Sequence, residues 1–252
     1  MVVMMAISTN KERKMKIAAH RGFSGKAPEN TLAAFKMAID FGCEWIETDV
    51  QLTADHVPVL IHDKTVNRCT NGQGAVRFHS LDDLHRLDAG SWFSSLYQGE
   101  KIPTLRQGLQ LIKRSGTKLN IELKTWPDDD VERLCLAVSE MIKSADIPNE
   151  QILFSSFDTH ALMVMKRYLP AIRRGQLWDD IPDNALETLQ AIEGFSVHCN
   201  YQYLTQQQAA MLKQAGYEIY CYTPNDPKEV KDFEAWGVDM LITDVPDIYR
   251  QN

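Results

Sequence analysis

No uninterrupted apolar stretch of about 18 residues, the length that a membrane-spanning helix needs, occurs in this sequence. Lysine and arginine also form no cluster interleaved with aromatic side chains, and the formal net charge of the 252 residues is −7. A surface that binds the phosphate backbone of nucleic acids is normally rich in such basic clusters. The sequence therefore predicts neither stable membrane anchoring nor a nucleic-acid partner.

The cysteines number five, are widely spaced and form no C-x-x-C pair. This pattern fits neither a disulfide framework nor a thiolate zinc site, so it predicts reduced thiols in a cytoplasmic protein. The N-terminus begins with about seven apolar residues and continues with the charged run Lys11–Lys14, the reverse of the order in a signal peptide. Residues 1–14 are interpreted as a disordered extension or as the result of an upstream start, and residues 15–252 as a single domain.

Short apolar segments typical of strands alternate with longer segments of helical periodicity. Strands are expected at residues 17–20, 44–49, 118–123, 151–155, 172–177, 194–198, 218–222 and 239–243. Helices are expected at residues 31–41 (after Asn30 as a cap), 105–115, 129–144, 159–168, 184–192, 205–215 and 227–236. Such alternation indicates a parallel sheet, and this number of strands predicts a closed (β/α)8 TIM barrel. An open doubly wound sheet is the alternative, but it does not explain polar residues at the ends of several different strands.

The second predicted strand forms the first arm of a hairpin. Residues 45–53 and 57–62 are joined by only Ala54-Asp55-His56, which is too short for a crossover helix, so the two segments must be antiparallel. If Asp55 and His56 are the central turn residues, His62 lies opposite Asp49. Residues 63–103 then interrupt the alternation with turns and a short helix near 80–87. They are predicted to be an insertion on the face of the barrel where loops form active sites.

Polar residues stand at the ends of several predicted strands. They are His20-Arg21, Glu47-x-Asp49, His62-Asp63 and Glu122-x-Lys124. Alternate residues of a strand share a face, so Glu47 lies on the same face as Asp49, and Glu122 on the same face as Lys124. Three carboxylates at one barrel mouth repel one another unless a cation lies among them, and an all-oxygen set suits Mg²⁺ or Ca²⁺ rather than zinc. Two histidines beside such a site can transfer protons.

Each motif taken alone also has a purely structural explanation. Glu122 and Lys124 suit a buried ion pair with no other role. Asp244, at the end of the last strand, suits either a pocket residue or a cap before Pro246. The segment Asn71–Gly74 lacks the Lys-Ser/Thr pair and the helix of a phosphate-binding P-loop, so it is interpreted as a turn. The absence of a His-x-His pair disfavours an amidohydrolase-type metal barrel.

The order and spacing of the whole set resemble those of the glycerophosphodiester phosphodiesterase family, most closely its soluble bacterial cytoplasmic type. The similarity runs from about residue 17 to residue 247. The motifs that carry it are His20-Arg21-Gly22, Pro28-Glu29-Asn30-Thr31, Glu47-x-Asp49, His62-Asp63, Asn71-Gly72-x-Gly74, Ile102-Pro103-Thr104-Leu105, Glu122-x-Lys124, Ser155-Ser156-Phe157 and Thr243-Asp244.

This resemblance implies the barrel fold with a small insertion after the second strand. It also implies that Glu47, Asp49 and Glu122 bind one divalent cation, Mg²⁺ or Ca²⁺. His20 and His62 are then expected to act as the acid–base pair.

The resemblance further implies that Arg21 and Lys124 hold the phosphate oxygens, and Tyr222 is expected to line the pocket. Two departures from the family pattern, Asp55-His56 in the hairpin turn and Pro224 after Tyr222, replace none of these residues.

The activity implied by the resemblance is hydrolysis of small glycerophosphodiesters, such as glycerophosphoethanolamine or glycerophosphocholine, to glycerol 3-phosphate and an alcohol. Two alternatives stay open: a phospholipase-like enzyme acting on lipid head groups, and a catalytically silent binding barrel. The preferred alcohol, the physiological metal and the oligomeric state are left undetermined by the sequence.

Overall fold

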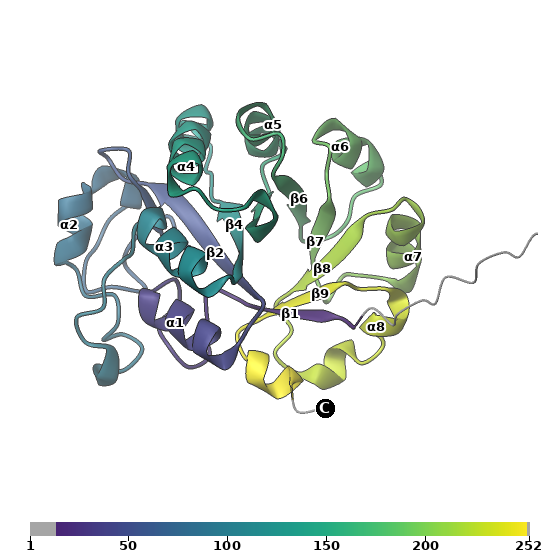
Figure 1. Cartoon of the computed structure of the whole chain (residues 1–252), viewed down its shortest axis with the longest axis horizontal. Helices are drawn as coiled ribbons and strands as arrows, with labels where there is room; N and C mark the ends of the chain where they lie inside the picture. Colours follow the sequence, from purple (N-terminus) through teal and green to yellow (C-terminus); the bar gives the residue numbers. More distant parts are fainter. Residues whose placement is uncertain (1–13, 251–252) are drawn as a thin grey trace, which may run out of the picture.

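The computed structural model describes residues 14–250. Its strands are β1 (Lys16–Ala19), β2 (Trp45–Leu52), β3 (Pro58–Leu60), β4 (Lys118–Leu123), β5 (Ile152–Ser156), β6 (Arg173–Trp178), β7 (Ser196–Asn200), β8 (Glu218–Tyr222) and β9 (Met240–Thr243). All except β3 pair in parallel, and β1 contacts both β2 and β9, which closes the sheet (Figure 1). The predicted (β/α)8 barrel is therefore confirmed. Except for Lys14, the proposed N-terminal extension lies outside the described residues.

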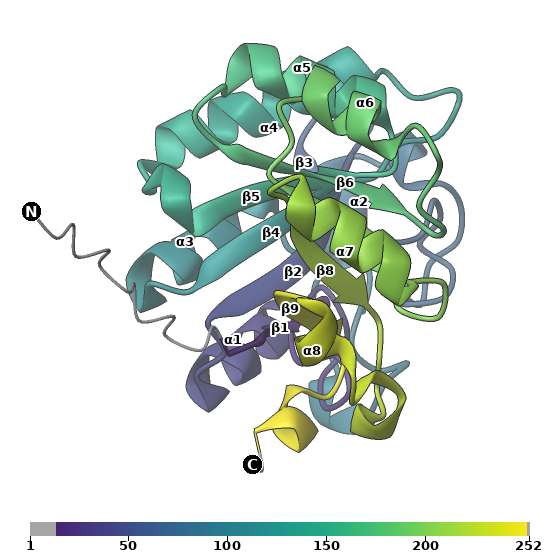
Figure 2. The ribbon, with the colours of Figure 1, turned by 90° about the vertical axis from the view of Figure 1, so that its right-hand side faces the viewer.

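Helices cover the outside of the barrel (Figure 2). They are α1 (Leu32–Phe41), α3 (Leu105–Ser115), α4 (Val131–Ala145), α5 (Thr159–Tyr168), α6 (Ala185–Ala191), α7 (Gln206–Gln214) and α8 (Phe233–Trp236), whereas α2 (Leu81–Arg86) lies in the segment between β3 and α3. Their apolar faces pack on the strands through buried residues such as Phe35, Leu109 and Leu162. Within residues 14–250, none of these helices is long and apolar enough to span a bilayer.

The observed helices differ from the predicted ones mainly in the residues that cap them and in where they end. Helix α1 begins at Leu32 because Thr31 is its N-cap and accepts a hydrogen bond from the backbone N–H of Ala34. Asn30 is thus not the cap, contrary to the prediction. The segment predicted as one helix over 227–236 is divided into a 3₁₀ turn (Pro227–Val230) and α8.

The hairpin of β2 and β3 is antiparallel, as predicted, but its register is shifted by one residue. Val50 pairs with Leu60, and the N–H of Ile61 donates to the carbonyl oxygen of Asp49, so Ile61 rather than His62 lies opposite Asp49. The physical reason is a three-residue turn, in which His56 adopts a left-handed conformation with φ of 61°. A left-handed residue after a type I turn is a common way to close such a loop.

The segment between β3 and α3 builds a small unit beside the barrel, seen at the left of Figure 1. It contains α2 and the 3₁₀ turns Val76–Phe78 and Ser95–Tyr97. A separate apolar cluster, which includes Val66, Leu84 and Ile102, packs against Ile61 of the hairpin. This packing holds the segment against the hairpin of β2 and β3.

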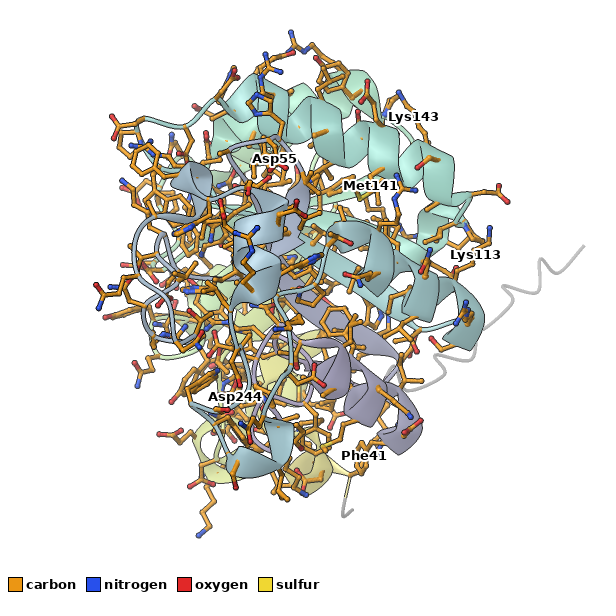
Figure 3. The ribbon with its side chains drawn as sticks, turned by 90° about the vertical axis from the view of Figure 1, so that its left-hand side faces the viewer. Phe41, Asp55, Lys113, Met141, Lys143 and Asp244 are labelled. Carbon is orange, nitrogen blue, oxygen red and sulfur yellow. The ribbon has the colours of Figure 1, made fainter. Side chains whose placement is uncertain are left out.

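The loops after the strands open at one end of the barrel. In Figure 3, Asp244, which follows β9, and Lys113, in the last turn of α3, lie toward opposite ends of the molecule. The residues that follow β1, β2, β4 and β9 therefore share one end, the usual position of an active site in this fold.

Candidate active site

Strands β2 and β4 bring three carboxylates together. Asp49 lies opposite Glu122 in the strand register, and Glu47 lies two residues before Asp49 on the same face. Glu47 is 4% exposed and Asp49 is 1% exposed. One carboxylate oxygen from each of the three residues lies within 4.8 Å of the others. The structure thus places the three predicted metal ligands in one cluster.

The electrostatics of this cluster favour a bound cation. Burial, together with the charges of Asp49 and Glu122, raises the pKa of Glu47 well above its ordinary value. Burial and the charge of Asp49 likewise raise the pKa of Glu122 to about 7. Oδ1 of Asp49 is buried, and it has no hydrogen-bond partner among residues 14–250. A hard divalent ion bound by oxygen ligands satisfies that oxygen and allows all three carboxylates to be charged, so the donor set fits Mg²⁺ or Ca²⁺.

Asp49 carries the charge most easily of the three residues. Burial alone would raise its pKa, but the charges of Arg21, His62 and Lys124 and a hydrogen bond from Asn30 outweigh burial and lower the pKa. Asn30 Nδ2 donates to Oδ2 of Asp49 at 2.8 Å. Its Oδ1 accepts from the hydroxyl of Thr48 at 2.7 Å. Asn30 therefore orients a candidate metal ligand instead of capping α1, a role that the sequence prediction missed.

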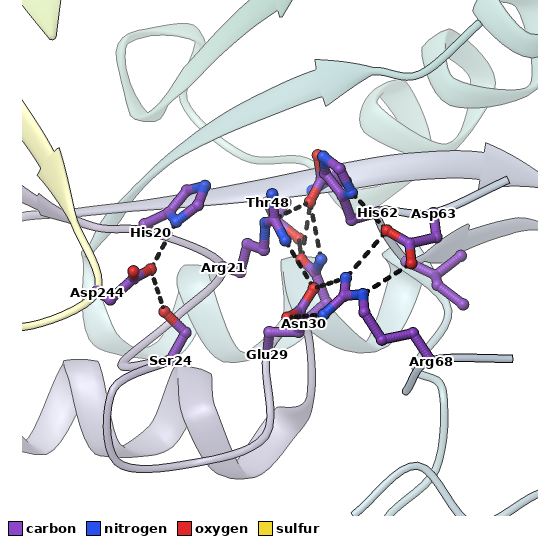
Figure 4. A network of polar contacts seen from close by, with 12 residues as sticks. His20, Arg21, Ser24, Glu29, Asn30, Thr48, His62, Asp63, Arg68 and Asp244 are labelled. Carbon is purple, nitrogen blue, oxygen red and sulfur yellow. Dashed lines mark hydrogen bonds and ion pairs between the residues drawn. The ribbon is translucent and has the colours of Figure 1, made fainter. Parts of the chain in front are cut away.

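His20 is held by Asp244. Nδ1 of His20 lies 2.7 Å from Oδ1 of Asp244 (Figure 4). Its Nε2 lies 3.8 Å from Oε2 of Glu47. Because an ionised carboxylate only accepts hydrogen bonds, Nδ1 carries the hydrogen and Nε2 is directed toward the carboxylate cluster. Asp244 also accepts from Ser24 and Asn225, each at 2.7 Å. Of the two roles left open for Asp244, the structure places it in the site.

Asp244 is charged under ordinary conditions. Burial acts to raise its pKa, but the hydrogen bonds from His20, Asn225 and Ser24 and the charge of His20 lower it below the usual range. A charged Asp244 stabilises a positively charged His20, which suits a histidine that takes up a proton during a reaction.

His62 has the same arrangement on the other side of the cluster. Its Nδ1 lies 2.8 Å from Oδ1 of Asp63 (Figure 4), and its Nε2 accepts from Nζ of Lys124 at 3.2 Å. Lys124 also donates to Oε1 of Glu122 at 2.8 Å. Burial, followed by the positive charges of Arg21 and Lys124, lowers the pKa of His62 despite the opposite effects of Asp49 and Asp63. The imidazole of His62 is therefore neutral near pH 7.

Arg21 is positioned by an unusual backbone turn. Its φ is 53°, and Gly22 follows with a φ of 80°. A Cβ atom on Gly22 would lie 2.7 Å from the backbone of Ala34, so only glycine fits. The turn directs the Arg21 N–H to Oε2 of Glu47 at 3.0 Å and brings its Nε within 3.3 Å of Oδ2 of Asp49.

The segment after the hairpin contributes Arg68, which sequence reasoning did not identify. Its guanidinium donates to both carboxylate oxygens of Glu29, at 2.7 and 2.8 Å, and to both of Asp63, at 2.7 and 3.0 Å (Figure 4). Glu29 in turn accepts from Arg21 at 2.7 Å. Glu29 stood in one of the family-like motifs, whereas nothing in the local pattern distinguished Arg68 from other surface arginines.

Seven of the predicted site residues line one cavity of about 160 Å³, whereas Asp49 does not. The predicted residues that line it are His20, Arg21, Glu47, His62, Glu122, Lys124 and Tyr222. The hydroxyl of Tyr222 donates to the carbonyl oxygen of Trp178 at 2.9 Å, and its ring makes an edge contact with Phe157 at 6.3 Å between centroids. Tyr222 therefore presents its ring to the cavity, beside Leu177. The cavity combines a charged wall with an apolar wall.

Comparisons with known proteins agree with this geometry. A profile of the glycerophosphoryl diester phosphodiesterase family matches residues 20–248. The chain is 34% identical to the glycerophosphodiester phosphodiesterase of Caldanaerobacter subterraneus subsp. tengcongensis, with 93% of this chain and 96% of that relative covered. It is 35% identical to the glycerophosphodiester phosphodiesterase of Bacillus altitudinis, with 92% and 95% covered.

Among solved structures, the fold is similar to that of an Oleispira antarctica phosphodiesterase in complex with the product sn-glycerol-3-phosphate. The TM-score is 0.88 at 37% sequence identity, with 92% of this chain and 93% of that chain covered. Because these matches span nearly all the described residues, the chain belongs to the glycerophosphoryl diester phosphodiesterase family and is an enzyme of that family.

Proposed function

We propose that this protein hydrolyses small glycerophosphodiesters, such as glycerophosphoethanolamine and glycerophosphocholine, to glycerol 3-phosphate and an alcohol. The observation that carries the proposal is the cluster of Glu47, Asp49 and Glu122 between two histidines, each of which is held through Nδ1 by a carboxylate. The product bound to the Oleispira antarctica relative supports the same substrate class.

The carboxylates and cations of the site suit a phosphodiester. Glu47, Asp49 and Glu122 would hold one divalent cation, Mg²⁺ or Ca²⁺, which when bound supplies positive charge to the phosphoryl oxygens. Arg21 and Lys124 lie beside these carboxylates and would bind the remaining phosphate oxygens. Neutralising the phosphate removes its repulsion of an incoming nucleophile and stabilises the transition state.

The two histidines would move the protons. Nε2 of His20 accepts the proton of the attacking hydroxyl, and the charged Asp244 stabilises the resulting imidazolium. His62 donates a proton to the oxygen of the departing alcohol. In the free protein, Nε2 of His62 accepts from Lys124, so its proton is acquired as substrate binds, when the phosphate attracts Lys124 and adds negative charge nearby.

Two attacking groups are compatible with this arrangement. The glycerol 2-hydroxyl, deprotonated by His20, attacks phosphorus and forms a cyclic phosphate, which water then opens to glycerol 3-phosphate. Alternatively, His20 activates a water molecule that attacks phosphorus directly. Both routes break the bond to the departing alcohol with His20 as the base and His62 as the acid. In the cyclic route the roles then reverse: His62 takes a proton from the attacking water, and His20 returns its proton to the 2-oxygen as the ring opens.

The deciding experiment is a side-by-side assay of phosphate esters with Mg²⁺, Ca²⁺ or a chelator. We expect release of glycerol 3-phosphate from ethanolamine, choline and glycerol diesters, with kcat/KM values that differ by less than about a hundredfold, because few contacts are available to read the alcohol. Faster cleavage of a lysophospholipid or diacyl phospholipid would support the phospholipase-like alternative. Binding without turnover of any diester would support the silent binding barrel.

Other features expected from the sequence remain proposals. We propose that residues 63–103 form an insertion that walls the pocket, since Arg68 from this segment reaches Glu29 and Asp63 beside the site. A cytoplasmic location and the absence of a nucleic-acid partner likewise remain predictions from the sequence.

A further inference from the structure

The floor of the catalytic cavity contains three buried polar atoms that the mechanism does not use. They are Oδ1 of Asn120, Oγ of Ser155 and Nδ1 of His198. Their residues are at most 1% exposed, and none of these atoms has a hydrogen-bond partner among residues 14–250. A buried polar atom without a partner is costly, and three around one cavity indicate that the cavity accommodates a polar group.

The strand register places these residues next to the carboxylate cluster. Asn120 lies opposite Glu47 and two residues before Glu122 on the same face of β4. Ser155 lies opposite Glu122 on β5. Neighbouring strands are about 4.8 Å apart, so the floor lies within a few ångströms of the oxygens that would hold the phosphate. A group bound there is close enough to be part of the same substrate molecule.

His198 reaches this floor because of a glycine on the neighbouring strand. A Cβ atom on Gly175 would lie 2.3 Å from Nε2 of His198 and 2.6 Å from the hydroxyl of Ser196. Glycine therefore leaves room for the His198 ring over β6, and Ser155 lies opposite Gly175 in the register. The Nε2 atom of His198 is engaged by Ser196 at 3.0 Å. The other ring nitrogen, Nδ1, is the one without a partner.

The chemistry of the floor is that of hydroxyl recognition. An amide, a hydroxyl and a neutral imidazole provide both donors and acceptors without net charge, and a hydroxyl group both donates and accepts. Burial lowers the pKa of His198 to about 3, so its ring is neutral when the enzyme works. The cavity volume of about 160 Å³ exceeds the roughly 10–15 Å³ that one water needs by the same measure, which leaves room for a small polyol.

We propose that Asn120, Ser155 and His198 form a hydroxyl-binding subsite that recognises the glycerol end of the substrate. This inference rests on the proposed function and adds which part of the substrate enters the barrel. The glycerol lies on the polar floor, whereas the departing alcohol faces the cavity mouth. Recognition of the glycerol hydroxyls also explains how one site accepts several head groups.

The test compares glycerophosphoethanolamine with the corresponding 1,2-propanediol diester. The second compound lacks only the terminal hydroxyl and keeps the hydroxyl that the cyclic route requires. We expect the wild-type enzyme to prefer the glycerol compound in kcat/KM. Ser155→Ala should reduce that preference by about tenfold, the effect of losing one buried hydrogen bond of roughly 1.4 kcal/mol. Competition by glycerol 3-phosphate and by 1,2-propanediol phosphate should show the same change in binding.

Ser156→Ala is the matched control. Ser156 is the next residue of β5 and is equally buried, but its hydroxyl donates to the carbonyl oxygen of Leu123 at 2.8 Å instead of facing the cavity. The control should leave the preference unchanged. Asn120→Ala is a second test variant, and thermal unfolding verifies that each variant is folded.

Equal preferences in wild type, Ser155→Ala and Ser156→Ala would show that only solvent occupies the floor and would overturn the subsite. A wild-type enzyme that binds glycerol 3-phosphate more tightly than 1,2-propanediol phosphate, but cleaves neither diester, would support the subsite and overturn the proposed function.

Discussion

Nδ1 of His20 lies 2.7 Å from Oδ1 of Asp244, although 224 positions separate the two residues along the chain. The contact exists because β1 pairs with β9, with Ala19 opposite Thr243. His20 and Asp244 are the next residues after these partners, so closure of the barrel itself brings the histidine to its orienting carboxylate. Two further contacts, from Ser24 and Asn225, hold Asp244 in place.

Asp244→Asn tests this relationship. The amide has the shape of the carboxylate but lacks its charge and can donate a hydrogen bond, so it favours the wrong tautomer of His20 and no longer stabilises the imidazolium. We expect kcat to fall by about 10²–10⁴-fold, with little change in metal affinity. Asp247→Asn, which removes the charge that pairs with Lys26, is the control for a nearby loss of charge. An unchanged kcat for Asp244→Asn would show that Asp244 is only a structural cap.

Glu47→Gln tests the metal site. The variant should bind Mg²⁺ or Ca²⁺ at least about tenfold more weakly in titration calorimetry, because it removes one charged ligand. Metal should raise the Tm of the wild type more than that of the variant. In chelator, by contrast, the variant should be as stable as the wild type or more stable, since one buried like charge is gone. Glu44→Gln, on the surface beside Lys118, is the control. Full turnover by demonstrably metal-free enzyme would contradict the proposed cation.

His62 determines one limb of the pH profile. Its lowered pKa means that in the free enzyme His62 gains its proton only below the ordinary value of 6.5. Because kcat/KM reports groups of the free enzyme, one limb of its profile should titrate below pH 6.5. His62→Gln should remove that limb and reduce kcat by about 10²–10⁴-fold. His85→Gln, on α2, should change neither, and a normal profile for His62→Gln would make this histidine structural.

Arg68 should affect catalysis from the segment between β3 and α3, because it holds the carboxylates of Glu29 and Asp63. Arg68→Gln breaks both bidentate contacts, which releases Asp63 behind His62 and Glu29 behind Arg21. We expect kcat/KM to fall by about 10–100-fold, as for other residues that orient catalytic groups. Arg68→Lys should not restore it, since an ammonium group cannot match two carboxylates in this way. Arg86→Gln, an exposed arginine on α2, is the control, and equal effects of Arg68→Gln and Arg86→Gln would exclude a positioning role.

His198 should make the fold sensitive to acid. Burial lowers its folded-state pKa from 6.5 to about 3. Below pH 6.5 the unfolded chain binds a proton at this residue and the folded chain does not. The free energy of unfolding should therefore decrease as the pH falls from 6.5 toward 3, by up to about 1.4 kcal/mol per pH unit from this group. Urea unfolding at several pH values measures how many protons the chain takes up on unfolding. His198→Phe should lower that number by about one, whereas His160→Phe, on α5, should leave it unchanged.

Much of the architecture is readable from local patterns. The alternation of apolar segments predicts the barrel, because strand and helix periods reflect which face of each element is buried. The same two-residue period places Glu47 and Asp49 on one face of β2. The helix caps and the hairpin register were less predictable, since Asn30 and Thr31 are both good cap residues and the turn has three residues rather than two.

The sequence by itself determined the fold and supplied the candidate ligand and proton-transfer residues, because these depend on local periodicity and on side-chain type. Only the tertiary structure decided which residues support them. Asp244 contacts His20, and Arg68 contacts Glu29, through loops from separate elements. Ser155 and His198 of the cavity floor come from different strands. Local patterns carry no information about such long-range contacts, since closure of the barrel and packing of the loops determine which distant residues lie within hydrogen-bond distance.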